Sequence, residues 1–437
     1  MHDDISSAFF DLEMRQTTAA FLKQNLSPYC PMSLYETQYY SACNISPRQL
    51  PSKPFKKARN SRCWVEAKMI LTHLSKLEVQ YYNVRRDEIA RFMFECLTTM
   101  KVNKEYARIL VDALVNVDLN KEFGEALYRL LLYVADLLDE SCNGSAKPKI
   151  LKSNDVTAWV DGMHTLGPVI GKFCMDMAIK KAKLHGIGII ITKNSNYLGK
   201  CTWFTKKAMQ KGLIGLAFSN TAHALCPTRA KQSYLGWNPV ALSAPASKRI
   251  NNFSLEVKST ALSLRQVVMC INRGQELPMN CAYDGNAALT TDPKDALYEG
   301  CMLPLGGLEE TGGYKGYALA IVVEIMCGIF GDSLYGDSIK RALERGREPT
   351  NLGHCFIAIN PNHFAGNFKK RMDDFAKSIR KIKPINANEP VIYPSSEVDK
   401  YMPSCVTVKN RLRYRLVDLM AAYQLSCILN VPPLVLK

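Results

Sequence analysis

Arg129 and Tyr133 form a pair whose residue types and spacing suggest chemistry. They stand four residues apart in a stretch with helical periodicity, residues 125–138, so both side chains are expected on one helix face. The planar fork of an arginine can bind both oxygens of a carboxylate, which makes an organic acid a suitable ligand. The same pair is also common on ordinary helix surfaces, so the spacing alone leaves both interpretations open.

General motifs for dinucleotide, phosphate and metal sites are absent from the sequence. A Rossmann fingerprint needs three glycines between a strand and a helix. Gly186 and Gly188 instead lead into an apolar run of strand length, and the third glycine is missing. No Walker A motif, HExxH motif or nucleophile elbow occurs. Because the seven histidines show no metal-ligand spacing, we predict no metal site.

Charge and cysteine usage limit the class of protein. The net charge of +16 fits either a basic solvated surface or an acidic partner. The 15 cysteines are odd in number and include no CxxC pair, so the sequence suggests neither a zinc ribbon nor a closed disulfide framework. Cys174, Cys327 and Cys427 lie among apolar residues, so we expect three buried thiols. This usage indicates a reducing compartment.

The N-terminal residues and the longest apolar run favour a cytoplasmic protein. Residues 1–15 carry four acidic side chains and no secretory pattern, which argues against a signal peptide and a mitochondrial presequence. The longest apolar run, residues 317–330, contains Glu324 and is too short to span a bilayer. We therefore expect a buried helix there and no transmembrane segment.

The pattern of residues along the chain predicts an N-terminal appendage followed by helical and mixed regions. Residues 1–80 are rich in Ser, Tyr, Pro and Gln and carry a basic cluster at 48–62, so we expect a partly disordered basic arm that an acidic partner would bind. Helical periodicity then extends over residues 87–138. The later expected helices are 171–185, 202–211, 317–328 and 368–382, and the expected strands are 187–192, 214–219, 240–245, 253–257 and 354–360.

A series of short strings in this region resembles the malate/L-lactate dehydrogenase-like family, which includes ureidoglycolate dehydrogenase. Each string is weak alone, and their order and spacing together carry the resemblance over residues 82–400. The strings are Asp161-Gly162 with Gly167, Gly171-Lys172, Ala178 to Gly188, Lys193 to Gly199, Ser219-Asn220-Thr221, Gly236 to Pro239, Thr290 to Pro293, Leu303 to Gly307, Gly313 to Tyr317, Asn351 to Gly353 and Ile359 to Asn362.

The resemblance implies an α/β fold with a mixed, largely antiparallel sheet that binds the dinucleotide without a Rossmann motif. It places this non-Rossmann domain at residues 151–364, and a helical domain at residues 81–150 together with 365–437. It further implies hydride transfer between NAD or NADP and the C2 atom of a small 2-hydroxy or 2-oxo acid, and a homodimer.

The family's substrate motif aligns with residues 118–133 without a gap. Arg129 and Tyr133 then hold its substrate-binding positions, and Glu125 stands where the family has a catalytic-site histidine. A carboxylate at this position would repel an anionic substrate unless Arg129 neutralises it.

The family's general acid/base histidine is replaced by Tyr197. A phenol titrates near pH 10, so at pH 7 Tyr197 can donate a proton during reduction. To act as a base it would need a pKa lowered by roughly three units, with Lys193 and Lys200 close in sequence. His223 is an alternative base.

The resemblance also assigns a set of cofactor-binding residues, several of which depart from the family pattern. Glu256 replaces an aspartate that meets a ribose hydroxyl, and Lys258 either favours a 2′-phosphate or blocks the pocket. Residues 308–312 are inserted before the GxKGY loop, and Ser395 replaces a glycine of the PGE-type loop. The complete set is Thr221, Asn238, Glu256, Lys258, Lys315, Ser395, Ser396 and Glu397.

These departures leave two main hypotheses. In the first, the protein is an NAD(P)-dependent oxidoreductase, with full or weakened activity, in which Tyr197 transfers the proton. In the second, it is a catalytically inactive relative, a pseudoenzyme that acts as a binding or structural protein. A third hypothesis, nucleic-acid binding through residues 48–62, has no aromatic recognition motif to support it.

Overall fold

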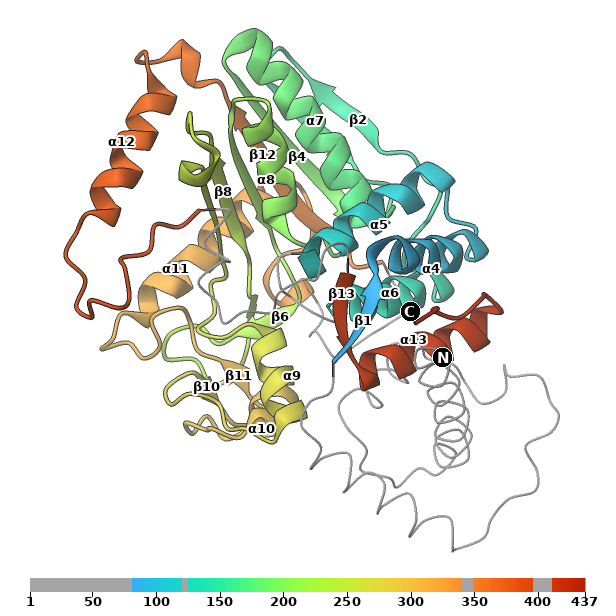
Figure 1. Ribbon diagram of the computed structural model, residues 1–437. Coiled ribbons are helices and arrows are strands. Elements are labelled where there is room, and N and C mark those ends of the chain that lie inside the picture. Colours follow the sequence, from blue (N-terminus) through green and yellow to red (C-terminus); the bar gives the residue numbers. More distant parts are fainter. Residues whose placement is uncertain (1–80, 120–124, 340–348, 396–410, 437) are drawn as a thin grey trace, which may run out of the picture. The chain divides into compact units, whose positions relative to one another are not determined.

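The computed structural model describes residues 81–119, 125–339, 349–395 and 411–436 (Figure 1). The chain forms two compact units, one made of residues 139–404 and one that combines residues up to 138 with residues 405–437. The predicted basic arm, residues 1–80, lies outside the described residues, as do Ser396 and Glu397.

A seven-stranded mixed sheet is the centre of the unit formed by residues 139–404. Its strand order is β2-β3-β4-β12-β5-β8-β9, and every pairing is antiparallel except that of β3 with β4. The strands are β2 (Lys149–Ser153), β3 (Thr157–Asp161), β4 (Ile187–Ser195), β12 (Leu352–Ile359), β5 (Ile214–Ser219), β8 (Val240–Ala244) and β9 (Phe253–Val257). This arrangement confirms the predicted non-Rossmann α/β fold.

Helices α7 (Gly167–His185) and α8 (Cys201–Gln210) pack on one face of this sheet (Figure 1). Alternate residues of each strand point to this face, among them Ile190 of β4 and Phe356 of β12, and the core there is fully buried. Helix α7 starts at Gly167, four residues earlier than the periodicity predicts, because Pro168 fits the first helical turn.

Helix α11 (Gly313–Glu324) covers the opposite face and continues into a π-helical turn, η2 (Ile325–Ile329). Val323 and Cys327 pack there on Ile191 and Cys355. The predicted buried helix at 317–328 is therefore present, although only one of its faces meets the sheet. No helix in the described part of the chain is long and apolar enough to cross a membrane.

A smaller four-stranded sheet has the order β10-β11-β6-β7 and lies beside helices α9 and α10. The sequence analysis did not predict these short elements. The strands are β6 (His223–Leu225), β7 (Leu235–Gly236), β10 (Ala282–Tyr283) and β11 (Cys301–Met302), and the helices are α9 (Leu264–Arg273) and α10 (Pro293–Tyr298). The same unit contains the 3₁₀ turns η1 (Arg249–Asn251), η3 (Gly336–Ser338) and η4 (Pro361–His363).

Helix α12 (Phe368–Arg380) belongs to the same compact unit as the sheets, whereas the predicted domain division ended at residue 364. The buried Asp373 of α12 accepts hydrogen bonds from the Lys248 amide at 3.1 Å and from Asn251 Nδ2 at 2.8 Å. These bonds connect α12 to η1. The contacts of α12, rather than its position in the sequence, therefore determine that it belongs to the unit of residues 139–404.

The other unit is built from both ends of the chain. Strands β1 (Tyr81–Arg85) and β13 (Arg411–Arg415) pair antiparallel, with Tyr81 opposite Arg415. The helices are α4 (Arg86–Thr99), α5 (Lys104–Leu119), α6 (Glu125–Leu138) and α13 (Leu416–Leu429). The predicted periodicity is confirmed, because Ile89, Phe92 and Leu130 are fully buried. Cys427 of α13 is exposed, so the expectation of a buried thiol there is wrong.

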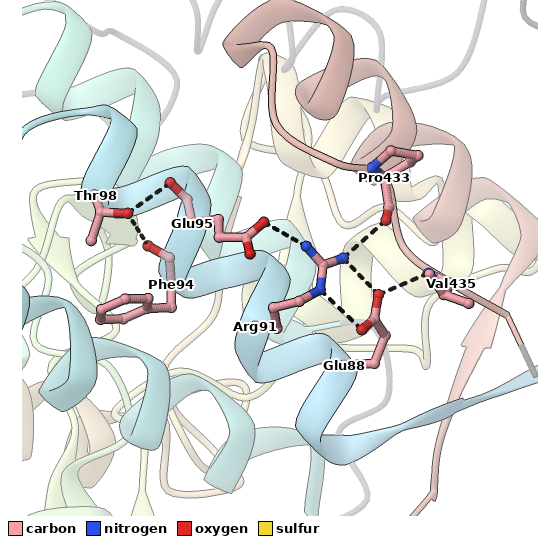
Figure 2. Close-up of polar contacts among 7 residues, drawn as sticks. All are labelled: Glu88, Arg91, Phe94, Glu95, Thr98, Pro433 and Val435. Carbon is pink, nitrogen blue, oxygen red and sulfur yellow. Dashed lines mark hydrogen bonds and ion pairs between the residues drawn. The ribbon is translucent and has the colours of Figure 1, made fainter.

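The C-terminal residues bind helix α4 through an ion-pair network (Figure 2). Arg91 of α4 pairs with Glu88 at 2.6 Å and donates to the Pro433 carbonyl at 2.9 Å. The Val435 amide in turn donates to Glu88 Oε1 at 2.8 Å. The Arg91 hydrogen bond lowers the pKa of Glu88, so the carboxylate stays charged.

Candidate active site

A fully buried histidine on the central strand links the ends of its two neighbours. His354 of β12 lies 2.7 Å from Ser195 Oγ through Nε2 and 2.9 Å from Ser219 Oγ through Nδ1. Ser195 ends β4 and Ser219 ends β5. Burial lowers the pKa of His354 to about 3, so the imidazole is neutral at physiological pH. No motif in the sequence points to this residue.

The two serines each precede a predicted site residue by two positions. Tyr197 follows Ser195, and Thr221 follows Ser219. The first residues of β12 and the preceding loop also hold both segments, since Thr350 Oγ1 donates to the Ser195 carbonyl and the Gly353 amide donates to Asn220 Oδ1 at 2.9 Å. The sheet therefore fixes the two segments that the resemblance assigns to proton transfer and cofactor binding.

The Tyr197 segment packs against the start of α7. Asn196 Oδ1 accepts a hydrogen bond from the Gly167 amide at 2.6 Å, which orients its side-chain amide. A Cβ atom at Gly167 would lie 2.2 Å from the Tyr197 carbonyl oxygen, so only glycine permits this approach. Asn196 Nδ2 is buried and has no hydrogen-bond partner in the structure. A donor therefore lies unused beside half-buried Tyr197.

Of the two lysines near Tyr197, Lys193 is engaged elsewhere. Its Nζ atom forms an ion pair with Asp332 at 2.5 Å and lies 4.7 Å from the centre of the Trp159 ring. The turn that follows is shaped by Asn194, which has a φ of 53° and whose amide donates to Asn351 Oδ1 at 2.8 Å. Lys193 is thus held by Asp332 and Trp159.

Thr221 and Asn238 come together over a buried carboxyl group. The Thr221 amide donates to Asn238 Oδ1 at 3.0 Å, and Asn238 Nδ2 donates to Glu324 Oε1 at 2.8 Å. Asn220 Nδ2 reaches the other Glu324 oxygen at 3.3 Å. Burial raises the pKa of Glu324. Thr221 and Asn238, both predicted as cofactor residues, are buried, so they support the Thr221 segment from inside the protein.

Glu256, Lys258 and Ser395 lie along β9 and its end. Glu256 Oε2 accepts a hydrogen bond from the Thr202 amide in the first turn of α8 at 2.9 Å. Both Glu256 and Lys258 act electrostatically on the buried thiol of Cys201, which places the two charges at the same helix end. Ser395 forms an antiparallel bridge with Phe253 at the other end of β9.

Lys315 and the inserted residues occupy the start of α11. Lys315 is exposed and lies 5.7 Å from the ring of Tyr314. The insertion is ordered, because Glu309 pairs with Arg229 at 2.7 Å and the Gly313 amide donates to the Leu308 carbonyl.

His223 borders a cavity that contains none of the other predicted site residues. The cavity has a volume of about 270 Å³ and is lined also by Trp237, Thr260, Tyr298 and Cys301. His223 Nε2 lies 2.5 Å from the Gly336 carbonyl, so Nε2 carries the proton and Nδ1 the lone pair. No group of three His, Cys, Asp or Glu side chains among the described residues could hold a metal ion.

In the unit made from the chain ends, Glu125 and Arg129 form an ion pair. Arg129 Nε donates to Glu125 Oε1 at 2.6 Å, with 13% and 11% of the two side chains exposed. The carboxylate is therefore neutralised by the arginine that the resemblance assigns to the substrate. Tyr133 is buried, with 2% exposed.

Asp118 holds the helices of this pair together. It is fully buried, accepts the Ala126 amide at 3.1 Å, and binds the Tyr414 hydroxyl of β13. Burial and the adjacent Asp118 raise the pKa of Tyr414. A role for Tyr414 was not predicted, because its partner Asp118 lies in a distant segment of the sequence.

Comparisons with known proteins agree with this architecture. The family model "Malate/L-lactate dehydrogenase" matches residues 84–402. L-sulfolactate dehydrogenase of Methanocaldococcus jannaschii is 34% identical over 262 residues, which are 60% of this chain and 73% of the relative. Malate dehydrogenase of Pyrococcus horikoshii is 31% identical over 307 residues, or 70% of this chain and 84% of the relative.

Solved structures give the same result. The crystal structure of malate dehydrogenase from Entamoeba histolytica has a TM-score of 0.74 at 27% identity and covers 81% of this chain and 99% of its own. Sulfolactate dehydrogenase from Methanocaldococcus jannaschii has a TM-score of 0.70 at 29% identity, with 80% and 98% covered. The chain belongs to the malate/L-lactate dehydrogenase family.

Proposed function

We propose that this protein is an NAD(P)-dependent oxidoreductase that transfers hydride between the nicotinamide and C2 of a small 2-hydroxy or 2-oxo acid. The observation that carries the proposal is the connection of the Tyr197 and Thr221 segments through the single buried His354. The relatives named as malate and sulfolactate dehydrogenases indicate the class of acid.

Tyr197 suits the direction of reduction. In that direction a hydride adds to the C2 carbonyl carbon, and the forming alkoxide takes a proton from the phenol. The products are the 2-hydroxy acid and the oxidised dinucleotide, and water re-protonates the tyrosine. Because a phenol normally titrates near pH 10, the donor form is populated at pH 7 without any shift.

Arg129 is the proposed ligand of the substrate carboxylate. Its bond from Nε to Glu125 fixes the plane of the guanidinium group, and a fixed plane favours two-point binding of a carboxylate. Tyr133 lies one helical turn further along α6. Glu125 itself takes the role of orienting Arg129 rather than of acid or base.

The residues around β9 fit a dinucleotide, which supplies the hydride when bound. Glu256 offers a carboxylate to a ribose hydroxyl, and Lys258 offers a cation to a 2′-phosphate. The two lie at the same end of α8, so NAD and NADP remain competing choices. One relative is named as an NAD(+) enzyme and another as an NADP(+) enzyme. Lys315 and residues 395–397 complete the proposed cofactor set.

A second function, that of a non-catalytic binding protein, is favoured by specific residues. Tyr197 and Glu125 occupy positions where the resemblance expects histidines, and residues 308–312 lengthen the loop before Lys315. If the protein is a non-catalytic binding protein, His223 has no role as a base.

One experiment separates the two functions. The purified protein is titrated with NADH and NADPH while nicotinamide fluorescence is followed, and 2-oxo acids that correspond to malate and sulfolactate are then added. We expect binding and oxidation of the reduced dinucleotide, with turnover lowered roughly 10²–10⁴-fold in Tyr197→Phe. Absence of dinucleotide binding would refute the proposed oxidoreductase function. Turnover that is lost in Tyr197→Phe would refute the non-catalytic function.

Three further proposals concern the location and partners of the whole protein. The described cysteines are free thiols, which suits the cytoplasm. The protein is proposed to be a homodimer. Residues 48–62 are proposed to bind an acidic partner, and salt-sensitive binding that survives deletion of residues 1–80 would refute this role.

A further inference from the structure

Two cysteines meet where strands β6 and β11 run side by side. Leu225 of β6 and Met302 of β11 are register partners, and the Cys226 amide continues the pairing by donating to the Met302 carbonyl at 2.9 Å. Successive side chains of a strand point to opposite faces, so the two residues next to this pair, Cys226 and Cys301, share the other face. Both are buried, with 0% and 3% exposed. The sheet thus brings together two thiols from distant parts of the sequence.

The two thiol groups are in direct contact. The Cys301 thiol donates a hydrogen bond to Cys226 Sγ, and this bond lowers the pKa of Cys226 against the effect of burial. Burial raises the pKa of Tyr283, the residue opposite Cys301 on β10, and both thiols add to this effect, so the phenol lies beside the pair. A thiolate at Cys226 is therefore stabilised by its neighbour, and the thiolate is the nucleophilic form of cysteine.

A second pair of buried thiols in the same compact unit has the opposite property. Cys327 and Cys355 pack in one apolar cluster. Burial raises the pKa of Cys355 to about 12 and that of Cys327 well above its usual value. Buried thiols of this kind are chemically inert. Proximity of two buried cysteines thus does not by itself favour the reactive thiolate, and the hydrogen bond between Cys301 and Cys226 distinguishes their pair.

A cavity gives small molecules a place beside this pair. Cys301 lines the cavity of about 270 Å³ described above, together with His223 and Tyr298. This volume exceeds many times the roughly 10–15 Å³ of probe-occupied space that one water molecule needs. Hydrogen peroxide is only slightly larger than water, so it fits in the cavity next to the Cys301 thiol.

We propose that Cys226 and Cys301 form a peroxide-sensitive modification site that closes into a reversible disulfide. The Cys226 thiolate attacks one oxygen of the peroxide, so that an S–O bond forms, the O–O bond breaks, and the leaving hydroxide takes up the thiol proton to become water. The Cys301 sulfur then attacks the sulfenic acid. An S–S bond forms, the S–O bond breaks, and the Cys301 proton leaves with the hydroxide as a second water. Two thiols are oxidised by two electrons in total, and one peroxide is reduced to two waters.

This disulfide ties β6 to β11 and closes a loop that contains three of the proposed cofactor residues, Asn238, Glu256 and Lys258. Disulfides in reducing compartments are usually transient and redox-sensing, which agrees with the free thiols of the described part of the chain. The inference does not rest on the proposed oxidoreductase function, because neither a dinucleotide nor an organic acid takes part.

Mapping of the oxidised full chain tests the proposal. Reduced protein is treated with hydrogen peroxide, free thiols are blocked with N-ethylmaleimide, and the single-chain band of a non-reducing gel is digested for mass spectrometry. We expect a Cys226–Cys301 disulfide that dithiothreitol removes, while Cys327 and Cys355 remain reduced as the matched control pair. Absence of the Cys226–Cys301 disulfide, or equal linkage of the control pair, would overturn the proposal.

A variant separates the two steps of the reaction. In Cys301→Ser the second thiol is absent, so the sulfenic acid of Cys226 persists, and dimedone should label Cys226 several-fold more than in the wild type after peroxide treatment. Cys270→Ser, a change at a half-buried cysteine of α9, is the control and should behave as the wild type. Equal labelling of Cys226 in the wild type and in Cys301→Ser would contradict the role of Cys301. The mapping of the wild type needs no variant, so it decides the question if Cys301→Ser fails to fold.

Discussion

His354 illustrates how a buried side chain acts on a site without entering it. The imidazole has one proton, so it donates to one of Ser195 and Ser219 and accepts from the other. Because both serines are bound to the same ring, a displacement of the Tyr197 segment would be transmitted to the Thr221 segment. Removal of the ring would take one of two partners from each serine hydroxyl, because Ser195 and Ser219 also donate to the carbonyl oxygens of the residues that follow them, at 3.4 and 3.1 Å. A lost hydrogen bond of this kind costs about 0.5–1.5 kcal/mol.

The depressed pKa of His354 predicts a pH-dependent stability. The unfolded chain binds a proton below about pH 6.5, whereas the folded chain does so only near pH 3. The contribution of His354 to stability is therefore lost as the pH falls through this window, at up to about 1.4 kcal/mol per pH unit. Urea unfolding of the wild type and of His354→Gln at pH 6.5, 5.5 and 4.5 should show a shallower decline in the variant, within this window.

An exposed histidine supplies the control for this measurement. His185→Gln on α7 should decline as steeply as the wild type, because that side chain is exposed. Equal declines in wild type and His354→Gln would contradict a neutral buried imidazole. Glu324 acts in the opposite direction, since its raised pKa lets the folded state keep a proton that the unfolded state releases as the pH rises above about 4.5.

The roles of these two residues could not be predicted from the sequence. His354 and Glu324 each stand in an apolar stretch, and the side-chain partners described above are 86 to 159 residues away in the chain. The partners meet only because β12 lies between β4 and β5, and strand order is not a local property. By contrast, Arg129 and its neighbours Glu125 and Tyr133 were found because they share a single helix.

At the level of elements, the packing of α7 on β4 depends on a missing side chain. A Cβ atom at Gly188 would lie 2.3 Å from the carbonyl oxygen of Ala178, which is backbone and cannot rotate away. The helix and strand would have to separate, and overpacking of a core typically costs about 1–3 kcal/mol.

We therefore expect Gly188→Ala to lower the free energy of unfolding by about 2–3 kcal/mol. Gly366→Ala is the control, because a Cβ atom there meets nothing within 4 Å, and it should change stability by less than about 0.5 kcal/mol. Chemical denaturation of the two variants measures the difference. A Gly188→Ala protein as stable as the control would show that α7 and β4 are not in close contact.

Elements were predictable in proportion to their length and regularity. Helix α6 and strand β4 are long enough to show a period, and both were found. Strands β7 and β10 have two residues each and carry no periodic signal. Strand β1 could not be assigned because its partner, β13, lies more than 300 residues later in the chain.

At the level of the whole molecule, the two compact units should unfold separately. Tyr414 reports on one unit only, because its hydroxyl binds the buried Asp118 within that unit. Calorimetry of the full chain should show two transitions, and Tyr414→Phe should lower one of them by roughly 2–8 °C for a loss of about 1 kcal/mol. Gly188→Ala should lower the other. A single transition shifted by both variants would contradict independent units.

The pairing of β1 with β13 also determines when each part of the protein can form during synthesis. Residues 81–138 are synthesised more than 270 residues before the strand and helix that complete their unit, β13 and α13. At roughly 5–20 residues per second, the early helices wait on the order of tens of seconds. Residues 139–404 are finished in that interval. During that interval the nascent chain exposes the apolar surface of α4 and α6 that α13 later covers, which makes this segment the natural client of a chaperone.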